Sequence, residues 1–269
     1  ILRCRIRARL AKEGSVEKLR PMRWMFPFAV VWVVSSCAVR HEPTVVAKVE
    51  RPALEEPAPL AKVAEVSQGP LEATRATRVT ISGIEFEGVA FDSRVCRLKV
   101  VDQEGGPGSK FADAGEAAVS CGGIAAVNAG FFTPEGKPLG LVVAGGNVRG
   151  AWNAGSSLGS GVWYESGEGS CAIRRRDAIG RGAAGGMREL LQAGPMLVDG
   201  DRAVTGLESE KTSARTLIAW DGGSRWWIGR TPPCTLADLA KALASRGPAG
   251  WPVKTALNLD GGRSSELWI

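Results

Sequence analysis

The chain ends in a short apolar strand that runs into a polar turn, and this stretch reads Ala256-Leu257-Asn258-Leu259-Asp260-Gly261-Gly262-Arg263-Ser264-Ser265-Glu266-Leu267. The glycine pair removes side-chain bulk where an amide, a carboxylate and two hydroxyls gather. Asn258 and Asp260 flank Leu259, so in an extended strand both point to the face opposite the apolar residues. This composition indicates a site; the alternative is a surface turn that ends a strand with Asp-Gly.

Short β-rich runs separated by glycine or proline continue backwards from this stretch to Arg78. The expected strands cover 78–82, 95–101, 124–128, 139–143, 161–164, 215–220, 226–229 and 256–259. One clear helix is expected over 236–245, because Thr235 can cap it, apolar residues recur on one face and Gly247 ends it. The segment from Trp220 to Trp226 predicts a hairpin with an Asp-Gly turn and tryptophans that pack in the core. We therefore expect a single α+β domain with few helices and a mixed or largely antiparallel sheet.

The first 76 residues differ in composition from this domain, which we place at 77–269. Residues 1–21 are rich in arginine without helical periodicity, and we interpret them as read-through upstream of Met22. Residues 22–37 hold an apolar run shorter than the roughly 20 residues that span a bilayer, followed by small residues and Cys37. They predict a lipoprotein signal peptide with lipid attached at Cys37, the alternative being an ordinary signal peptide. Residues 38–76, rich in proline and alanine, predict a tether.

The signal sequence predicts a lipid-anchored protein of the bacterial cell envelope, in the outer membrane or the periplasm. Ala38 is not the aspartate that resembles an inner-membrane retention signal, which favours the outer membrane. The net charge of +6 does not indicate a nucleic-acid partner, because much of the excess lies in arginines of the first 20 residues.

The chain has one histidine, His41, which lies in the predicted tether. Ser-His-Asp, Cys-His and histidine-based zinc chemistry are therefore excluded from the domain. Without a histidine partner, the nucleophile-elbow pattern at 155–159 is interpreted as a flexible loop. The dinucleotide-fingerprint pattern at 180–185 is interpreted the same way, because the charged run at 174–177 cannot be a buried parallel strand, although a short helix at 187–192 is possible after it.

Four cysteines lie in the expected domain: Cys96, Cys121, Cys171 and Cys234. In an oxidising compartment they predict one or two disulfides, with three pairings open if all four are bridged and free buried thiols as the alternative. No spacing indicates a metal site or a cofactor.

Three further segments share the strand-end character of the terminal stretch. Polar or glycine-rich turns adjoin apolar runs at 127–141, 192–198 and 211–216. In this combination and order, with Asn-Leu-Asp-Gly-Gly-x-Ser-Ser as the most specific element, the motifs resemble the phosphodiester glycosidase family over roughly 91–268. Arg263 and Ala129 stand where the family more often has glycine or a small residue. The family usually continues past this motif, which predicts a domain truncated at its C-terminus.

The resemblance implies hydrolysis of the glycosidic bond in a sugar 1-phosphodiester. The leaving group is a phosphate monoester with a second pKa of about 6, so one carboxylate without strong general-acid help can suffice. We expect Asp260 to activate water or to stabilise positive charge at the anomeric carbon. Asn128 and Asn258 are expected to orient that water or a sugar hydroxyl.

The remaining expected site residues bind substrate. Phosphate would be held by Arg215, Thr216, Ser264, Ser265 and the amides of Gly261 and Gly262. Close backbone approach and loop geometry would come from Gly130, Phe131, Gly140, Gly194, Pro138 and Pro195.

Each of these assignments has a structural alternative. Arg215 can pair with Glu208 or Glu210 on the surface, and the two serines can cap the last strand. Glu266 and Glu135 are expected to be solvated, although either can supply an acid. A divalent cation on Asp260 and Asn128 is possible but not required, since two oxygen ligands fall short of a dedicated site.

The competing functions are a non-catalytic envelope protein that binds phosphorylated glycan and a phosphodiesterase that cuts the P–O bond. The identity of the sugar and of the aglycone, the stereochemical outcome and the oligomeric state are not indicated by the sequence.

Overall fold

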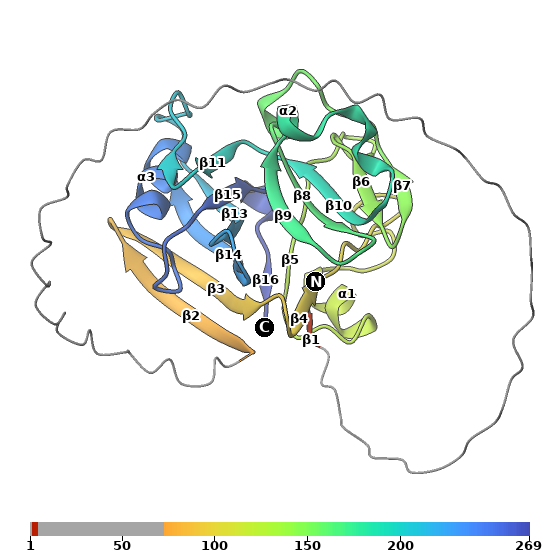
Figure 1. Cartoon of the computed structure of the whole chain (residues 1–269), viewed down its shortest axis with the longest axis horizontal. Coiled ribbons are helices and arrows are strands. Elements are labelled where there is room, and N and C mark those ends of the chain that lie inside the picture. The colour runs from red at the N-terminus through yellow and green to blue at the C-terminus, as the bar shows by residue number, and fades with distance from the viewer. Residues whose placement is uncertain (1, 5–72) are drawn as a thin grey trace, which may run out of the picture. The chain divides into compact units, whose positions relative to one another are not determined.

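The computed structural model describes residues 2–4 and 73–269 of the 269-residue chain (Figure 1). These described residues belong to one compact unit. The predicted signal peptide with Cys37, and the predicted tether up to residue 72 with His41, lie outside them. None of the helices in the described ranges has the length and apolar character needed to cross a membrane.

A seven-stranded antiparallel sheet forms the larger layer, in the order β12-β11-β15-β13-β14-β3-β2 (Figure 1). In that order its strands are Arg202–Ala203, Met196–Asp199, Thr255–Asn258, Ser213–Trp220, Arg225–Cys234, Ile84–Asp92 and Thr74–Ile81. β2 begins three residues before the predicted start of the domain. It joins β3 through Ser82 and Gly83, whose φ values of 50° and 81° suit a tight hairpin turn.

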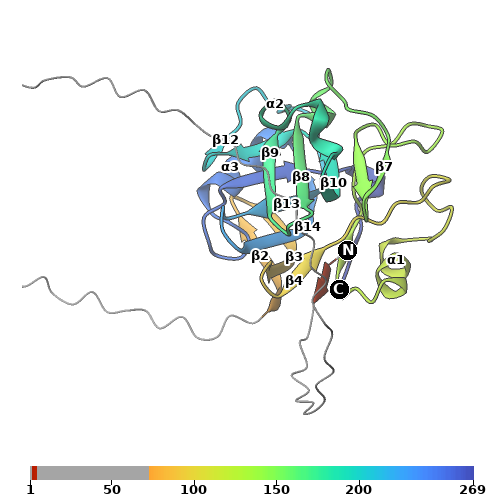
Figure 2. The ribbon, with the colours of Figure 1, turned by 45° about the vertical axis from the view of Figure 1, so that its right-hand side comes forward.

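A five-stranded antiparallel sheet forms the second layer, in the order β7-β6-β10-β8-β9 (Figure 2). Its strands are Asn147–Arg149, Val142–Ala144, Met187–Ala193, Gly161–Ser166 and Cys171–Arg175. Two smaller antiparallel pairs join β1 (Leu2–Cys4) to β4 (Cys96–Leu98) and β16 (Leu267–Trp268) to β5 (Ala126–Val127). The prediction of an α+β domain with largely antiparallel sheet is confirmed.

The described helices are α1 (Ala114–Ser120), α2 (Arg176–Ile179) and α3 (Leu236–Ser245). α3 has the predicted bounds, and the Thr235 hydroxyl accepts a 3.0 Å hydrogen bond from the Asp238 backbone N–H. It packs against β11 of the larger sheet, whereas α1 contacts β5 and β16 and lies beside the two sheets in both views (Figures 1 and 2).

Two apolar cores follow from the alternation of side chains along the central strands. On one face of the larger sheet, Leu217 and Trp227 pack with α3 residues such as Leu243. On the other face, Ile218 and Ile228 join residues of the five-stranded sheet. Because both faces are covered, β13 carries an unbroken apolar run after Thr216.

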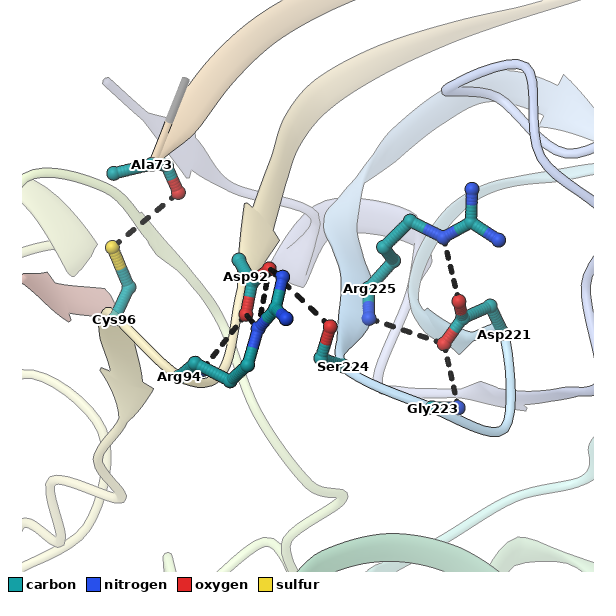
Figure 3. Close-up of polar contacts among 8 residues, drawn as sticks. All are labelled: Ala73, Asp92, Arg94, Cys96, Asp221, Gly223, Ser224 and Arg225. Atoms are coloured by element: carbon teal, nitrogen blue, oxygen red, sulfur yellow. Dashed lines mark hydrogen bonds and ion pairs between the residues drawn. The ribbon is translucent and has the colours of Figure 1, made fainter. Parts of the chain in front are cut away.

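The predicted hairpin at Trp220–Trp226 is confirmed as the connection of β13 to β14. The Asp221 carboxylate accepts hydrogen bonds from the Gly223 and Arg225 backbone N–H groups and closes the turn, as Figure 3 shows. The rings of Trp220 and Trp226 stack with centroids 5.1 Å apart, and both residues are buried. They are core residues, as expected.

Asp92 at the end of β3 anchors this corner of the sheet. Its carboxylate is 4% exposed and accepts hydrogen bonds from Arg94 and from the Ser224 hydroxyl (Figure 3). The Arg94 hydrogen bond lowers the pKa of Asp92 despite its burial.

The possible helix at 187–192 is wrong, because this segment is the central strand β10. Residues 189–193 are all buried between β6 and β8 and the layers on either side, so pairing within the sheet overrides local helix preference. The arginines at 174 and 175 are the exposed residues of β9, an antiparallel edge strand. The two glycine-rich patterns form short 3-10 turns, Ser157–Gly159 and Arg181–Ala184.

The cysteines do not pair among themselves as expected. Cys121, Cys171 and Cys234 are free, and Cys96 is in a disulfide with none of these three. The three free thiols lie at the end of α1, on β9 and at the end of β14, which are separate elements that do not bring them together. Burial raises the pKa of Cys171 to about 11, so this thiol stays protonated at neutral pH.

Candidate functional site

A cavity of about 430 Å³ opens between the two sheets at the end where several strands finish. Residues 98–103 and 126–132 line it, together with Asp260 and other residues of the terminal stretch. Its inner wall consists of buried apolar side chains from both sheets and from the residue that follows β15: Val142, Trp163, Leu191, Ile218, Ile228 and Leu259. Its volume lies in the range of roughly 300–1,000 Å³ that small-molecule sites occupy.

Asn128, at the end of β5, ties the cavity wall to two other segments. Its Nδ2 donates to the Asp260 backbone carbonyl at 2.8 Å, while its Oδ1 accepts from the Thr216 hydroxyl at 2.7 Å and from the Glu266 backbone N–H at 3.0 Å. Both functional ends of the amide are therefore engaged within the protein. Asn128 positions Asp260 and Glu266, and one N–H of its amide remains for a ligand.

Asp260 lies on the cavity wall two residues after the end of β15 and is half-buried. Burial raises the pKa of its carboxyl, although hydrogen bonds from the Ser264 hydroxyl and the Gly261 backbone N–H act in the opposite direction. The Gly261 N–H donates to Oδ1 at 2.9 Å. Among the described residues no arginine or lysine forms an ion pair with this carboxylate. An unpaired, partly desolvated acid on a cavity is typical of a functional site.

The glycine pair allows the turn that follows Asp260. A side chain at Gly261 would lie 2.6 Å from the Ala214 carbonyl oxygen, and Gly262 has a φ of +63°. The turn leads into a 3-10 segment, Gly262–Ser264, whose Arg263 and Ser264 line the cavity. The Ser265 hydroxyl is buried without a hydrogen-bond partner in the described part of the chain, and Ser265 is not a lining residue.

Arg263 and Glu266 line the cavity, although the sequence did not lead us to expect Arg263 in the site and led us to expect Glu266 to be solvated. Arg263 is exposed at the mouth, and within the described residues its guanidinium has no ion pair or hydrogen bond. Glu266 accepts a 2.7 Å hydrogen bond from the Ala114 backbone N–H at the start of α1. The one sequence signal that could have placed Arg263 in the site was its position in the terminal motif, where a small residue is more usual.

Other predicted site residues do not line the cavity. Arg215 donates to the backbone carbonyls of Cys234 and Lys211, and forms no ion pair with the glutamates at 208 and 210. Thr216 is fully buried and reaches the site through Asn128. Arg215 and Thr216 are neighbours on β13, so they point to opposite faces of the sheet.

Asn258 also lies away from the cavity, which differs from the expectation that it shares a face with Asp260. β15 ends at Asn258, so the strand alternation does not continue to Asp260. Its Nδ2 donates to the Gly194 and Leu259 carbonyls, and its Oδ1 is buried with no partner among the described residues. Asn258 thus joins the end of β15 to the Gly194–Pro195 segment.

The predicted close-approach glycines lie where backbones crowd around Gln192. Gly130 and Phe131 line the cavity, and a side chain at Gly140 would lie 2.7 Å from the Gln192 carbonyl oxygen. Gly194 packs directly against the Ser157 carbonyl. The Gln192 side chain is buried and makes four hydrogen bonds to residues 141, 153 and 159. These contacts hold the loops in place. Gly140, Gly194 and Pro195 do not line the cavity.

Two buried glutamates hold the far wall of the cavity in place. Glu189 accepts a 3.0 Å hydrogen bond from the Val100 backbone N–H, and burial raises its pKa. Glu165 lies opposite Glu189 in the β8–β10 pair and forms a 2.7 Å ion pair with Arg97. The segment that carries Leu98 and Val100 is therefore attached to the smaller sheet by buried polar contacts.

Within residues 73–269 no group of three or more histidine, cysteine, aspartate or glutamate side chains has the arrangement of a metal site. A cation shared by Asp260 and Asn128 does not fit this geometry well, because the Asn128 oxygen already accepts two hydrogen bonds.

The fold and the site define a two-sheet domain with an acid at the mouth of a small-molecule cavity. The family model described as phosphodiester glycosidase matches residues 122–269, more than half of the chain. The chain belongs to the phosphodiester glycosidase family.

One solved structure shows the same fold, and a second is similar at a lower score. The catalytic domain of zebrafish N-acetylglucosamine-1-phosphodiester α-N-acetylglucosaminidase, auto-inhibited by its pro-peptide, matches with a TM-score of 0.54 at 18% identity, over 76% of this chain and 75% of that one. A hypothetical protein from Synechocystis matches with a TM-score of 0.48 at 17% identity, over 73% of this chain and 57% of that one. No curated protein sequence matches this chain.

Proposed function

We propose that this protein hydrolyses the glycosidic bond of a sugar 1-phosphodiester and releases free sugar and a phosphate monoester. The observation that carries the proposal is Asp260, a partly desolvated carboxylate that has no ion pair within the described residues. It lies on a cavity that also holds Arg263, for which the same part of the chain provides no partner. Membership of the phosphodiester glycosidase family supports it. The zebrafish relative is named for the same class of substrate.

Asp260 is the acid–base group of this proposal. Its raised pKa favours the taking up of a proton from an attacking water, and its negative charge stabilises an anomeric carbon that becomes positive. A phosphate monoester leaves readily because its second pKa is only about 6. A strong general acid on the leaving-group side is then unnecessary, which fits the lack of histidine among residues 73–269.

Arg263 is the phosphate-binding side chain, because the one hydroxyl hydrogen of Ser264, beside it on the cavity, is donated to Asp260. A guanidinium matches phosphate oxygens bidentately. Lys99 lines the same cavity and adds positive charge. Of the other lining acids, Asp102 is paired with Arg149 at 3.4 Å, and Asp113 accepts a hydrogen bond from the Glu116 backbone N–H as the cap of α1.

Glu266 is the second carboxyl of the site. One of its oxygens is held by the Ala114 N–H, and Asn128 fixes its backbone next to Asp260. It is placed to orient the attacking water or a sugar hydroxyl. The lipid anchor at Cys37 and residence in the cell envelope remain proposals from the sequence, and they bring the enzyme to substrates of that compartment.

A reducing-sugar assay on the full chain tests the proposal. Purified protein is incubated with a panel of sugar 1-phosphodiesters, beside Asp260→Asn and the exposed control Asp177→Asn, which also loses one carboxylate. We expect sugar release by the wild type and the control, and a loss of roughly 10²–10⁴-fold in Asp260→Asn. Saturable binding without turnover in any variant would support the non-catalytic glycan-binding function instead.

A further inference from the structure

The inner wall of the cavity is formed by two rows of apolar side chains that face each other across the sheets. Val142, Leu191 and Trp163 lie side by side in register on β6, β10 and β8. Ile218 and Ile228 lie in register on β13 and β14 of the other sheet. All five line the same cavity as Asp260, and each is at most 7% exposed.

The charged lining groups come from the connecting segments and the terminal turn. Asp260, Arg263 and Glu266 belong to the turn, and Asp113 precedes α1. The cavity is therefore divided into a charged part, where a phosphate and sugar hydroxyls find partners, and an apolar part enclosed by the two sheets. A pyranose ring in the apolar part would lose the hydrogen bonds that its hydroxyls make to water.

Trp163 adds one polar feature to the apolar part. It is 3% exposed, and its indole N–H has no hydrogen-bond partner among the described residues. Buried N–H groups are paired in the great majority of cases, so the unpaired N–H of a residue that lines a cavity calls for an acceptor, which a ligand can supply. The indole N–H of Trp226 is likewise unpaired in the part of the chain that the structure describes, but this residue stacks on Trp220 and does not line the cavity. The position of Trp163 on the lining is what distinguishes the two.

We infer that the substrate is the phosphodiester of a sugar with an amphiphilic alcohol, whose hydrocarbon chain enters between the two sheets. This inference rests on the proposed function and names the aglycone class of the same site. The phosphate stays beside Arg263 and Ser264, the sugar stays in the charged part, and the chain contacts the two apolar rows. An oxygen carried on the chain, such as an acyl carbonyl, accepts the hydrogen bond of Trp163.

A chain-length series tests the inference on the full chain. Methyl, butyl and octyl esters of one sugar 1-phosphate are compared with an ester of a second sugar, and kcat/KM and the calorimetric Kd are both measured. We expect kcat/KM and affinity to rise by up to about fourfold for each buried methylene and to exceed those of the diglycosyl compound. Values that do not change with chain length, or a preference for the second sugar, would overturn the inference.

A matched pair of tryptophan variants tests the hydrogen bond. Trp163→Phe removes the unpaired N–H of a lining residue, and Trp226→Phe removes the equivalent N–H of a residue that does not line the cavity. With an octyl ester that carries an acyl carbonyl, Trp163→Phe is expected to weaken binding about two- to tenfold, while the plain octyl ester and Trp226→Phe show no such loss. Equal losses for both esters would contradict the role of Trp163.

The two proposals fail in different ways. If the proposed function is wrong, no ester releases sugar. If only the aglycone class is wrong, sugar is released at a rate that does not depend on chain length. If no ester is cleaved, the Kd series still decides: affinity that grows with chain length supports the apolar subsite, and constant affinity removes it.

Discussion

The two faces of the seven-stranded sheet are built from the same strands, yet one face is closed by a helix and the other borders a cavity. β13 supplies Leu217 to the α3 side and Ile218 to the cavity side. On the α3 side, Leu239 and Leu243 are fully buried against the sheet. On the opposite side, Ile218 and Ile228 border about 430 Å³ of space that protein atoms do not fill.

The difference separates residues that stabilise the fold from residues that serve the site. Protein interiors are close-packed, and unfilled apolar space costs stability because its lining loses dispersion contacts. The face toward the five-stranded sheet also has a buried core, but the part that borders the cavity lacks the contacts that would fill it. The cavity is therefore best understood as a ligand site, and substitutions on the two faces are expected to act on different properties.

Leu243→Ala tests the closed face and has the largest expected effect on stability. Removal of this fully buried side chain leaves a void between α3 and the sheet, at a cost of about 2–5 kcal/mol in the free energy of unfolding. Urea unfolding measures the loss, and kcat of the folded enzyme is expected to stay unchanged. A selective loss of kcat with normal stability would mean that the α3 face takes part in function.

Arg263→Ala and Arg215→Ala together test which arginine binds phosphate. Loss of a charge-assisted hydrogen bond to phosphate should raise KM by roughly 10–150-fold, and we expect this in Arg263→Ala, which lines the cavity. Arg215→Ala should change KM little, because its guanidinium is bonded to backbone carbonyls. Initial rates over a range of substrate concentrations provide both values. The reverse result would restore the sequence-based assignment of Arg215.

Ala240→Val and Val142→Ile add volume to the two faces. Ala240 is fully buried on α3, so one larger side chain there should overpack the core and cost about 1–3 kcal/mol. Val142 borders the cavity, so the extra methylene should be accommodated with little change in unfolding free energy. Thermal and urea unfolding measure both. Equal costs on the two faces would indicate that the cavity is not open space.

Asp260→Asn is expected to stabilise the protein by about 0.5–2 kcal/mol at neutral pH, the smallest of these effects. Burial raises the pKa of Asp260 in the folded state, so its ionisation costs folding free energy above that pKa. The gain should be complete at pH 7 and should disappear as the pH falls through the raised pKa towards the unfolded value of about 3.9. Urea unfolding at several pH values measures it. A variant that is less stable at pH 7 would contradict a desolvated Asp260.

Capping and turn residues in the sequence correctly predicted one helix and one hairpin. The Thr235 cap fixed α3, and the Asp-Gly turn fixed the β13–β14 hairpin. β10 could not be predicted in this way, because Met187–Ala193 becomes a strand through pairing with β6 and β8. Its sheet partners are distant in the sequence, so a short window favours the wrong element.

The sequence predicted the polar site residues that follow a strand. It was less successful for residues whose position depends on the face of the strand to which they point. Asn128 and Asp260 do meet at one cavity, in line with the strand-end argument. Parity along β13 could have shown that Arg215 and Thr216 face opposite sides. No such rule applies after Asn258, where β15 ends and a turn of glycines sets the direction of Arg263 and Glu266.

The most direct test of the central claim is hydrolysis of a sugar 1-phosphodiester in ¹⁸O-labelled water, followed by mass spectrometry of both products. Attack at the anomeric carbon, assisted by Asp260, predicts that the label enters the free sugar and that the phosphate monoester stays unlabelled. Label in the phosphate would show that the P–O bond is cut, and would contradict the account.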